Sequence, residues 1–104
     1  MLVDTSLPTD LHKVKEASIL ANELGFDGIF AAEVTADPFV TSAVASQHVQ
    51  NMDLGTKIAV AFARTPMTTA YAAYNLGELS DGRFHLGLAT QVRAPVTRRF
   101  SMPW

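Results

Sequence analysis

The apolar positions of the chain switch between two spacings, and these switches predict alternating strands and helices. Over residues 11–24 the apolar side chains recur at helical spacing, and Thr9 or Asp10 is placed to cap the first turn. Gly25 then stands where the end of a helix favours a left-handed residue. Residues 26–32 are almost continuously apolar, which is typical of a parallel strand buried on both faces.

The same order extends to both sides of this unit. Residues 2–5 form a short apolar run that is expected to be an opening strand. Asp37 and Pro38 predict the start of a second helix over residues 38–51, because proline fits the first turn of a helix. The residues expected on or near the inner face of that helix are Phe39, Val40, Ala43, Val44 and His48.

The second half of the chain repeats the pattern. Residues 53–56 are expected to turn the chain, residues 57–63 to form a third strand, residues 65–79 a third helix and residues 84–88 a fourth strand. Strands and helices that alternate through short connections predict an α/β fold with a parallel sheet and right-handed crossovers. Residues 90–104 show no clear period and are expected to form a long loop.

Composition narrows the class of protein. With 104 residues, 48% of them apolar and 17% charged, the chain is expected to fold as one soluble domain. A net charge of -2 argues against a nucleic-acid partner, and the absence of cysteine excludes disulfides and thiolate metal sites. No signal-peptide pattern or membrane-spanning apolar run is visible, so we expect a cytoplasmic protein without a membrane or metal partner.

Four ordered motifs resemble the luciferase-like monooxygenase superfamily. Residues 79–89, Leu-Ser-Asp-Gly-Arg-Phe-His-Leu-Gly-Leu-Ala, are similar to that superfamily's fourth strand and the turn before it. Residues 23–29 resemble its passage from helix one to strand two, and residues 54–60 its entry to strand three. Residues 64–66, Arg-Thr-Pro, resemble the Arg-x-Pro that follows strand three. The order of the motifs carries the resemblance, because each glycine alone is an ordinary helix stop or strand residue.

The resemblance implies a fold and a chemistry. Residues 1–104 would be the N-terminal portion of a TIM (β/α)8 barrel, about four parallel strands and three helices, with residues 90–104 as a truncated loop or tail. Residues 36–39 and 98–104 look like the branch that uses the deazaflavin coenzyme F-420, with FMN as the alternative cofactor. The implied reaction is hydride transfer to, or monooxygenation of, a small organic substrate.

Candidate cofactor-binding residues follow from the rule that such barrels keep their active site at the carboxyl ends of the strands. Glu33 is the acid at the end of strand two, where it is expected to accept a hydrogen bond from the cofactor or to orient a neighbour. The structural alternatives are a solvated loop carboxylate or a partner for Arg64. Ala61 and Phe62 end strand three. A small residue such as Ala61 would allow a ring to approach, although barrel filling explains it equally well, and Phe62 is expected to pack rather than to stack on the ring. Thr90 and Gln91 follow strand four; they are expected to bond the ring's polar edge or simply to cap the loop.

Two departures from the superfamily leave the catalytic residue unassigned. Val34 and Thr35 stand where a histidine often follows the acid of strand two. Val92 stands close to the position where some deazaflavin enzymes carry a proton-donating acid. His85 is expected to point into the barrel, away from the mouth, as interior filling rather than as a base. The superfamily also implies a non-prolyl cis peptide or a bulge in strand three.

A barrel that stops halfway presents a physical problem, because it leaves one sheet face and two strand edges open. A complete barrel of this class needs eight strands and about 250 residues. Three hypotheses follow: an N-terminal fragment of an oxidoreductase with little activity alone, a half-barrel that self-associates through its open sheet edges and binds the cofactor, or a non-catalytic α/β protein-interaction module. The first is favoured for ancestry and chemistry.

Overall fold

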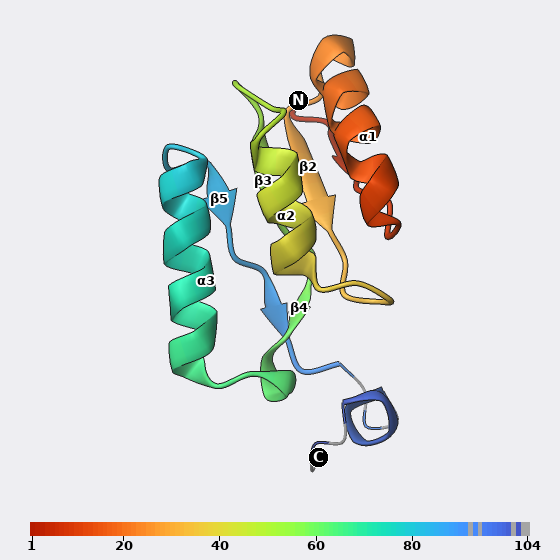
Figure 1. Ribbon diagram of the computed structural model, residues 1–104, viewed down its shortest axis with the longest axis vertical. Helices are drawn as coiled ribbons and strands as arrows, with labels where there is room; N and C mark the ends of the chain where they lie inside the picture. The colour runs from red at the N-terminus through yellow and green to blue at the C-terminus, as the bar shows by residue number, and fades with distance from the viewer. Residues whose placement is uncertain (92, 94, 101, 103–104) are drawn as a thin grey trace.

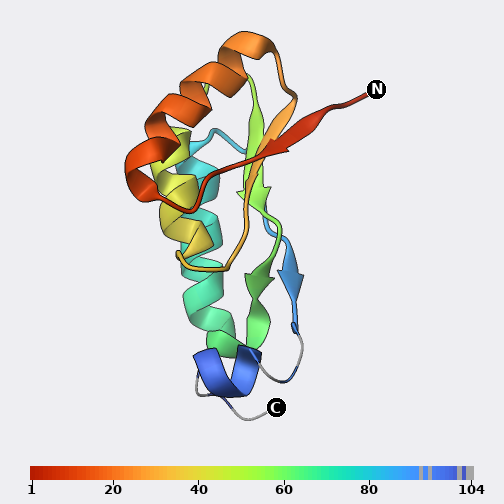
Figure 2. The same cartoon turned by 90° about the vertical axis from the view of Figure 1, so that its right-hand side faces the viewer.

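The computed structural model of the chain describes residues 1–91, 93, 95–100 and 102. Three α-helices lie along one side of parallel strands, and Figure 2 shows all three on the same side. The helices, labelled in Figure 1, are α1 (Leu11–Leu24), α2 (Pro38–Ser46) and α3 (Pro66–Leu79). The strands are β1 (Asp4–Ser6), β2 (Gly28–Ala31), β3 (Asp53–Thr56), β4 (Ala59–Val60), β5 (Phe84–His85) and β6 (Leu88–Ala89). Two short turns of helix, η1 (Ala61–Ala63) and η2 (Pro95–Arg99), complete the described part.

The strands pair in parallel throughout, as the strand–helix alternation predicts. One sheet has the order β1-β2-β3-β5, and β4 pairs with β6 in a second, two-stranded sheet. Gly28 of β2 lies opposite Asp4 on one side and Asp53 on the other. Along the chain β3 leads into β4, and β5 leads into β6. The second sheet therefore extends the first beyond the point where β2 ends (Figure 1).

The helix starts follow from their capping residues. Asp10 accepts a hydrogen bond from the backbone N–H of His12, and Asp37 and Thr65 cap α2 and α3 in the same way. Gly25 ends α1 with φ 81°, a conformation that glycine adopts without steric cost. The predicted bounds of α1 are confirmed, and α3 runs to Leu79 as expected.

The second helix is shorter than predicted. It ends at Ser46, and the following residues form tighter turns, with the N–H of His48 donating to the carbonyl of Ala45 at 2.9 Å. The chain leaves the helix because Val49 and Met52 turn into the core, where both are buried. The placement of Val40 on the inner face was wrong, since 47% of its surface is exposed.

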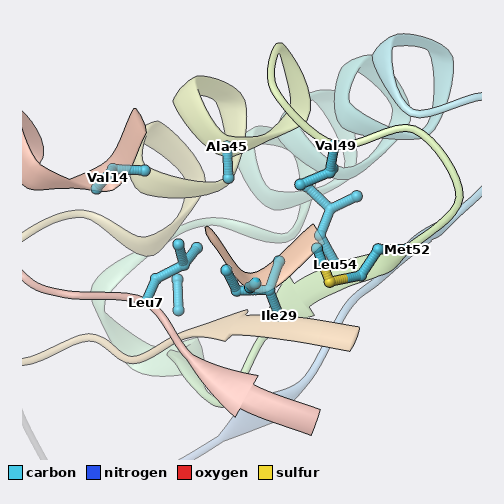
Figure 3. Close-up of a cluster of buried hydrophobic side chains, with 9 residues drawn as sticks. Leu7, Val14, Ile29, Ala45, Val49, Met52 and Leu54 are labelled. Atoms are coloured by element: carbon cyan, nitrogen blue, oxygen red, sulfur yellow. The ribbon is translucent and has the colours of Figure 1, made fainter. Parts of the chain in front are cut away.

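The main core lies between α1, α2 and the sheet (Figure 3). Ile29 and Leu54 project from adjacent strands on the helix side and are fully buried. Burial of one such side chain contributes about 1.5–3 kcal/mol. The labelled side chains of Figure 3 that surround them are Leu7, Val14, Ala45, Val49 and Met52.

The third strand begins earlier than predicted and is interrupted. Residues 53–56, expected to be a turn, form β3 because they pair residue by residue with β2 and bury Leu54. A cis peptide bond joins Lys57 and Ile58, as the resemblance implies, and only Ala59 and Val60 continue as a strand. Residues 61–63, predicted as strand, form the 3-10 turn η1.

The fourth strand and the tail also differ from expectation. β5 and β6 are separated at Gly87, where Thr56 takes over the pairing: its hydroxyl donates to the Gly87 carbonyl at 2.8 Å and accepts from the Gly87 N–H at 2.9 Å. Leu86 and Leu88 line a hollow beside Pro66 and Thr69 of α3 and remain 40% and 46% exposed. Part of the predicted loop 90–104 forms η2, while the positions of Val92 and of the terminal Trp104 lie outside the described residues.

Candidate functional site

The loop after β2 places a buried carboxylate at the end of the sheet. Glu33 Oε1 accepts a hydrogen bond from the backbone N–H of Val60 at 2.6 Å and from Arg64 Nη1 at 2.7 Å. Its other oxygen, Oε2, accepts from Arg64 Nη2 at 2.7 Å. The Glu33 side chain is 7% exposed. The expected structural alternative, pairing with Arg64, is therefore present, and both carboxylate oxygens are engaged.

Arg64 joins three chain segments at this point. Besides the two-pronged contact with Glu33, its Nη1 donates to the carbonyl of Val60 at 3.2 Å, and its Nη2 lies 3.4 Å from Asp37 Oδ1. The guanidinium carbon stands 4.9 Å from the centre of the Phe39 ring, a cation–π arrangement. Hydrogen bonding to Glu33 raises the pKa of Arg64 above its ordinary value, although burial acts in the opposite direction.

The sequence indicated only part of this network. Arg64 was recognised as a possible partner of Glu33, but its contacts with Val60 and Asp37 were not foreseen. Asp37 was expected only to start α2, which it does by accepting from the N–H of Phe39 at 2.9 Å. The usable signal was the Arg-Thr-Pro motif, because an arginine at the end of an apolar strand needs an acidic partner nearby.

The parallel register brings the other predicted residues to the same end. Val60 pairs with Ala89, so Ala61 and Phe62 continue from β4 beside the place where Thr90 and Gln91 continue from β6. Ala61 is half-buried, whereas Phe62, Thr90 and Gln91 are exposed. Gln91 has φ 60°, in the left-handed region. Glu33, the η1 turn and the end of β6 are therefore neighbours, as a common mouth requires, while their contact with a cofactor stays a prediction.

His85 lies far from this end of the sheet. Its Nε2 is 3.0 Å from Asp53 Oδ2 near the amino end of β3, and its ring centre is 6.4 Å from that of Phe30. The side chain lies on the face opposite the helices, as expected, but that face is open in this chain and the side chain is 59% exposed. His85 thus does not act as interior filling here, because no layer covers it.

A hollow of about 470 Å³ opens beside Glu33. It is lined by residues 33–37 and by Arg99 and Phe100 of the tail. Arg99 Nη1 donates to the carbonyl of Val34 at 2.9 Å, and Val96 of η2 is fully buried. The described tail residues therefore lie against the loop after β2, at the same end of the sheet as the predicted mouth.

Two kinds of site are not found in the described residues. No group of three or more histidine, aspartate and glutamate side chains there is placed to hold a metal ion. None of the helices in that part of the chain is long and apolar enough to cross a membrane.

Comparison with known proteins identifies the family to which this fold and these strand ends belong. The family model for luciferase-like monooxygenases matches residues 2–104. The chain belongs to this family. Uncharacterised proteins of Mycobacterium bovis and Mycobacterium tuberculosis are 44% identical to it over 102 residues, which is 98% of this chain and 30% of theirs. A putative coenzyme F-420-dependent oxidoreductase of Mycobacterium tuberculosis is 41% identical over 69 residues, 65% of this chain and 20% of its own length.

Solved structures of luciferase-like enzymes contain the same fold. The monooxygenase RslO1 from Streptomyces bottropensis superposes with a TM-score of 0.86 at 18% identity, over 98% of this chain and 37% of its own. The coenzyme F-420-dependent tetrahydromethanopterin reductase of Methanopyrus kandleri gives 0.84 at 20% identity, over 99% and 30%. The fold is therefore that of part of a luciferase-like barrel, and this chain spans about a third of the length of the curated relatives it matches.

Proposed function

We propose that this chain supplies the first part of a luciferase-like (β/α)8 barrel, with residues 1–104 as its N-terminal portion and residues 90–104 as its tail. In that role it provides one side of the mouth in which coenzyme F-420 binds. The reaction proposed for the assembled barrel is hydride transfer to, or monooxygenation of, a small organic substrate. FMN is the alternative cofactor.

One observation carries this proposal: the ends of β2, β4 and β6 lie together at the carboxyl edge of parallel strands. Barrels of this type place their active sites at that edge. The hydrogen bond from the Val60 N–H to Glu33 and the pairing of Val60 with Ala89 define the arrangement. The family membership then gives this edge its expected ligand.

The residues at this edge fit the ring of such a coenzyme. A tricyclic ring needs a close-packed backbone of small residues, an apolar contact, and donors and acceptors for its polar edge. Ala61 and the exposed Phe62 would provide the first two, and the Thr90 hydroxyl and the Gln91 amide the third. The bound coenzyme would supply hydride or oxygen-activating chemistry, while these residues would hold and orient it.

Coenzyme F-420 is proposed ahead of FMN because of two relatives. The putative oxidoreductase of Mycobacterium tuberculosis and the reductase of Methanopyrus kandleri are both named as coenzyme F-420-dependent enzymes. FMN remains the alternative because the oxygenating constituent of 3,6-diketocamphane monooxygenase from Pseudomonas putida, which superposes with a TM-score of 0.85 at 13% identity, was solved with FMN. The superposition covers 99% of this chain and 33% of the Pseudomonas putida protein.

The experiment is a spectroscopic titration followed by a turnover assay. Purified chain is added to each coenzyme, and fluorescence and absorption of the ring are followed. We expect a shift with coenzyme F-420 that saturates, and little or no turnover, because the chain spans about a third of its relatives. The absence of any shift with either coenzyme would contradict cofactor binding. Measurable hydride transfer by the chain alone would contradict the expected inactivity.

Self-association is a second candidate that one feature favours. Among the described residues, the outer strands β1 and β5 have unpaired edges, and the helices cover a single face of the sheet (Figure 2). Two copies that pair through these edges would form a compact dimer, which light scattering distinguishes from a monomer or an aggregate. A stoichiometric unrelated partner in a pull-down would instead favour the non-catalytic interaction module.

A further inference from the structure

The hydrogen bonds between the β2 segment and the third strand continue beyond the end of β2. The Lys57 N–H donates to the carbonyl of Ala31 at 2.7 Å, and the Glu33 N–H donates to the carbonyl of Ile58 at 3.2 Å. The next bond uses a side chain, because the Val60 N–H donates to Glu33 Oε1 at 2.6 Å. A carboxylate thus replaces a main-chain carbonyl as the partner of β4.

Arg64 closes this arrangement from the other side. It binds both oxygens of Glu33 and also donates to the Val60 carbonyl, so the two side chains engage both peptide groups of Val60. Its own N–H donates to the carbonyl of Ala61 at 3.3 Å. The η1 turn, Ala61–Ala63, lies between these attachments, which restrain it at both ends.

Burial makes this pair sensitive to change. The side chains of Glu33 and Arg64 are 7% and 14% exposed. Removing one member of a buried ion pair leaves the other charge without compensation, which is strongly unfavourable. Lysine in place of arginine keeps the charge but cannot reproduce the two-pronged contact.

We infer that Glu33 and Arg64 are a positioning pair: they hold the end of β4 and the η1 turn in the conformation that presents Ala61 and Phe62 to the coenzyme ring. The link to the ring rests on the proposed function. The hold on Val60 is independent of it. Glu33 therefore acts through the backbone of Val60 and not as a direct ligand.

The test measures amide exchange and coenzyme affinity in Glu33→Gln. Exchange of the Val60 N–H, followed by NMR, is expected to accelerate at least about tenfold, because glutamine keeps one neutral acceptor oxygen and places an NH2 donor against Arg64, so the charge-assisted bond to Val60 is weakened. The core amides of Ile29 and Leu54 are expected to keep their protection. Affinity for coenzyme F-420, or for FMN if that is the coenzyme bound, is expected to weaken at least about threefold, because the fraction of molecules that hold the η1 turn in the binding conformation falls.

The control is Asp53→Asn, which removes the carboxylate that contacts His85 near the amino end of the sheet and should leave Val60 unchanged. If Glu33→Gln does not fold, Arg64→Lys is used instead: it keeps the charge but loses the two-pronged contact that fixes Glu33, so faster Val60 exchange is expected in the same direction. Unchanged Val60 exchange, or equal acceleration at Leu54, overturns the positioning pair. Faster Val60 exchange with unchanged affinity overturns its link to the mouth. A wild-type chain that binds neither coenzyme contradicts the proposed function. The exchange data then still test whether Glu33 and Arg64 fix the backbone of Val60.

Discussion

Replacing glycine by alanine is expected to have opposite effects on stability at Gly55 and at Gly77. A Cβ at Gly55 would press into the backbone carbonyl oxygen of His85 on the neighbouring strand, and would lie 3.0 Å from its carbonyl carbon and 3.1 Å from its Cβ. These atoms belong to paired strands, so the clash can be relieved only by separating β3 from β5. At Gly77, within α3, an added Cβ meets nothing within 4 Å.

The magnitudes follow from these surroundings. Gly55→Ala is expected to cost about 1–3 kcal/mol, the range for overpacking that shifts backbone. Gly77→Ala is expected to add about 0.5–1 kcal/mol, because alanine loses less conformational entropy than glycine on forming a helix. In a domain of this size, 1 kcal/mol corresponds to roughly 4–8 °C in Tm.

Thermal unfolding followed by circular dichroism measures both variants against the wild-type chain. The expected result is a lower Tm for Gly55→Ala and a higher Tm for Gly77→Ala. Equal melting of Gly55→Ala and the wild-type chain would refute the close approach of β3 and β5, and with it this part of the sheet. The Gly77 variant is the matched control, since it introduces the same methyl group at an open position.

Three further substitutions probe the core, the strand switch and a helix cap. Leu54→Ala should lower the free energy of unfolding by about 2–5 kcal/mol because the side chain is fully buried. Leu24→Ala, at an exposed position, should change it by no more than about 0.5 kcal/mol. Comparable urea midpoints for the two variants would contradict the burial of Leu54. Thr56→Val should cost about 1–3 kcal/mol by leaving the Gly87 N–H unpaired, and unaltered stability would show that this bond is dispensable. Asp37→Ala should cost about 0.5–2 kcal/mol through loss of the α2 cap, with Asp37→Asn, which can still cap, as the control.

Local signals in the sequence predicted the elements that local chemistry determines. The cap at Asp10, the left-handed Gly25 and the helical spacing between them define α1 without reference to the rest of the chain. Pro66 and its capping threonine do the same for α3. The parallel order of the strands then followed from the alternation of elements.

The third strand shows what local signals miss. Residues 53–56 contain an aspartate, a glycine and a threonine, which favour a turn, yet they form β3 because β2 and β5 supply pairing partners on both sides. Likewise, residues 61–63 are as apolar as a strand but turn away where η1 begins. Both outcomes depend on contacts distant in sequence, which residue patterns do not encode.

The candidate site was predictable in its location but not in its construction. Strand ends gave Glu33 and Thr90 as neighbours of one edge, and the register agrees. The sequence left the role of Glu33 open between a cofactor ligand, a residue that orients a neighbour, a solvated carboxylate and a partner of Arg64. The geometry shows the partner, and adds the Val60 backbone, because a side chain that replaces a strand partner leaves no trace in residue patterns.

The most direct test of the central claim is a map of the coenzyme contact on the isotopically labelled chain. Oxidised coenzyme F-420 is titrated into the protein and amide shifts are followed by NMR, with FMN in parallel. The account predicts that the largest shifts gather at Glu33, at residues 60–63 and at residues 89–91, the carboxyl ends of the strands. Shifts centred on Asp4, Asp53 and His85 at the opposite end, or no shifts with either coenzyme, would contradict it.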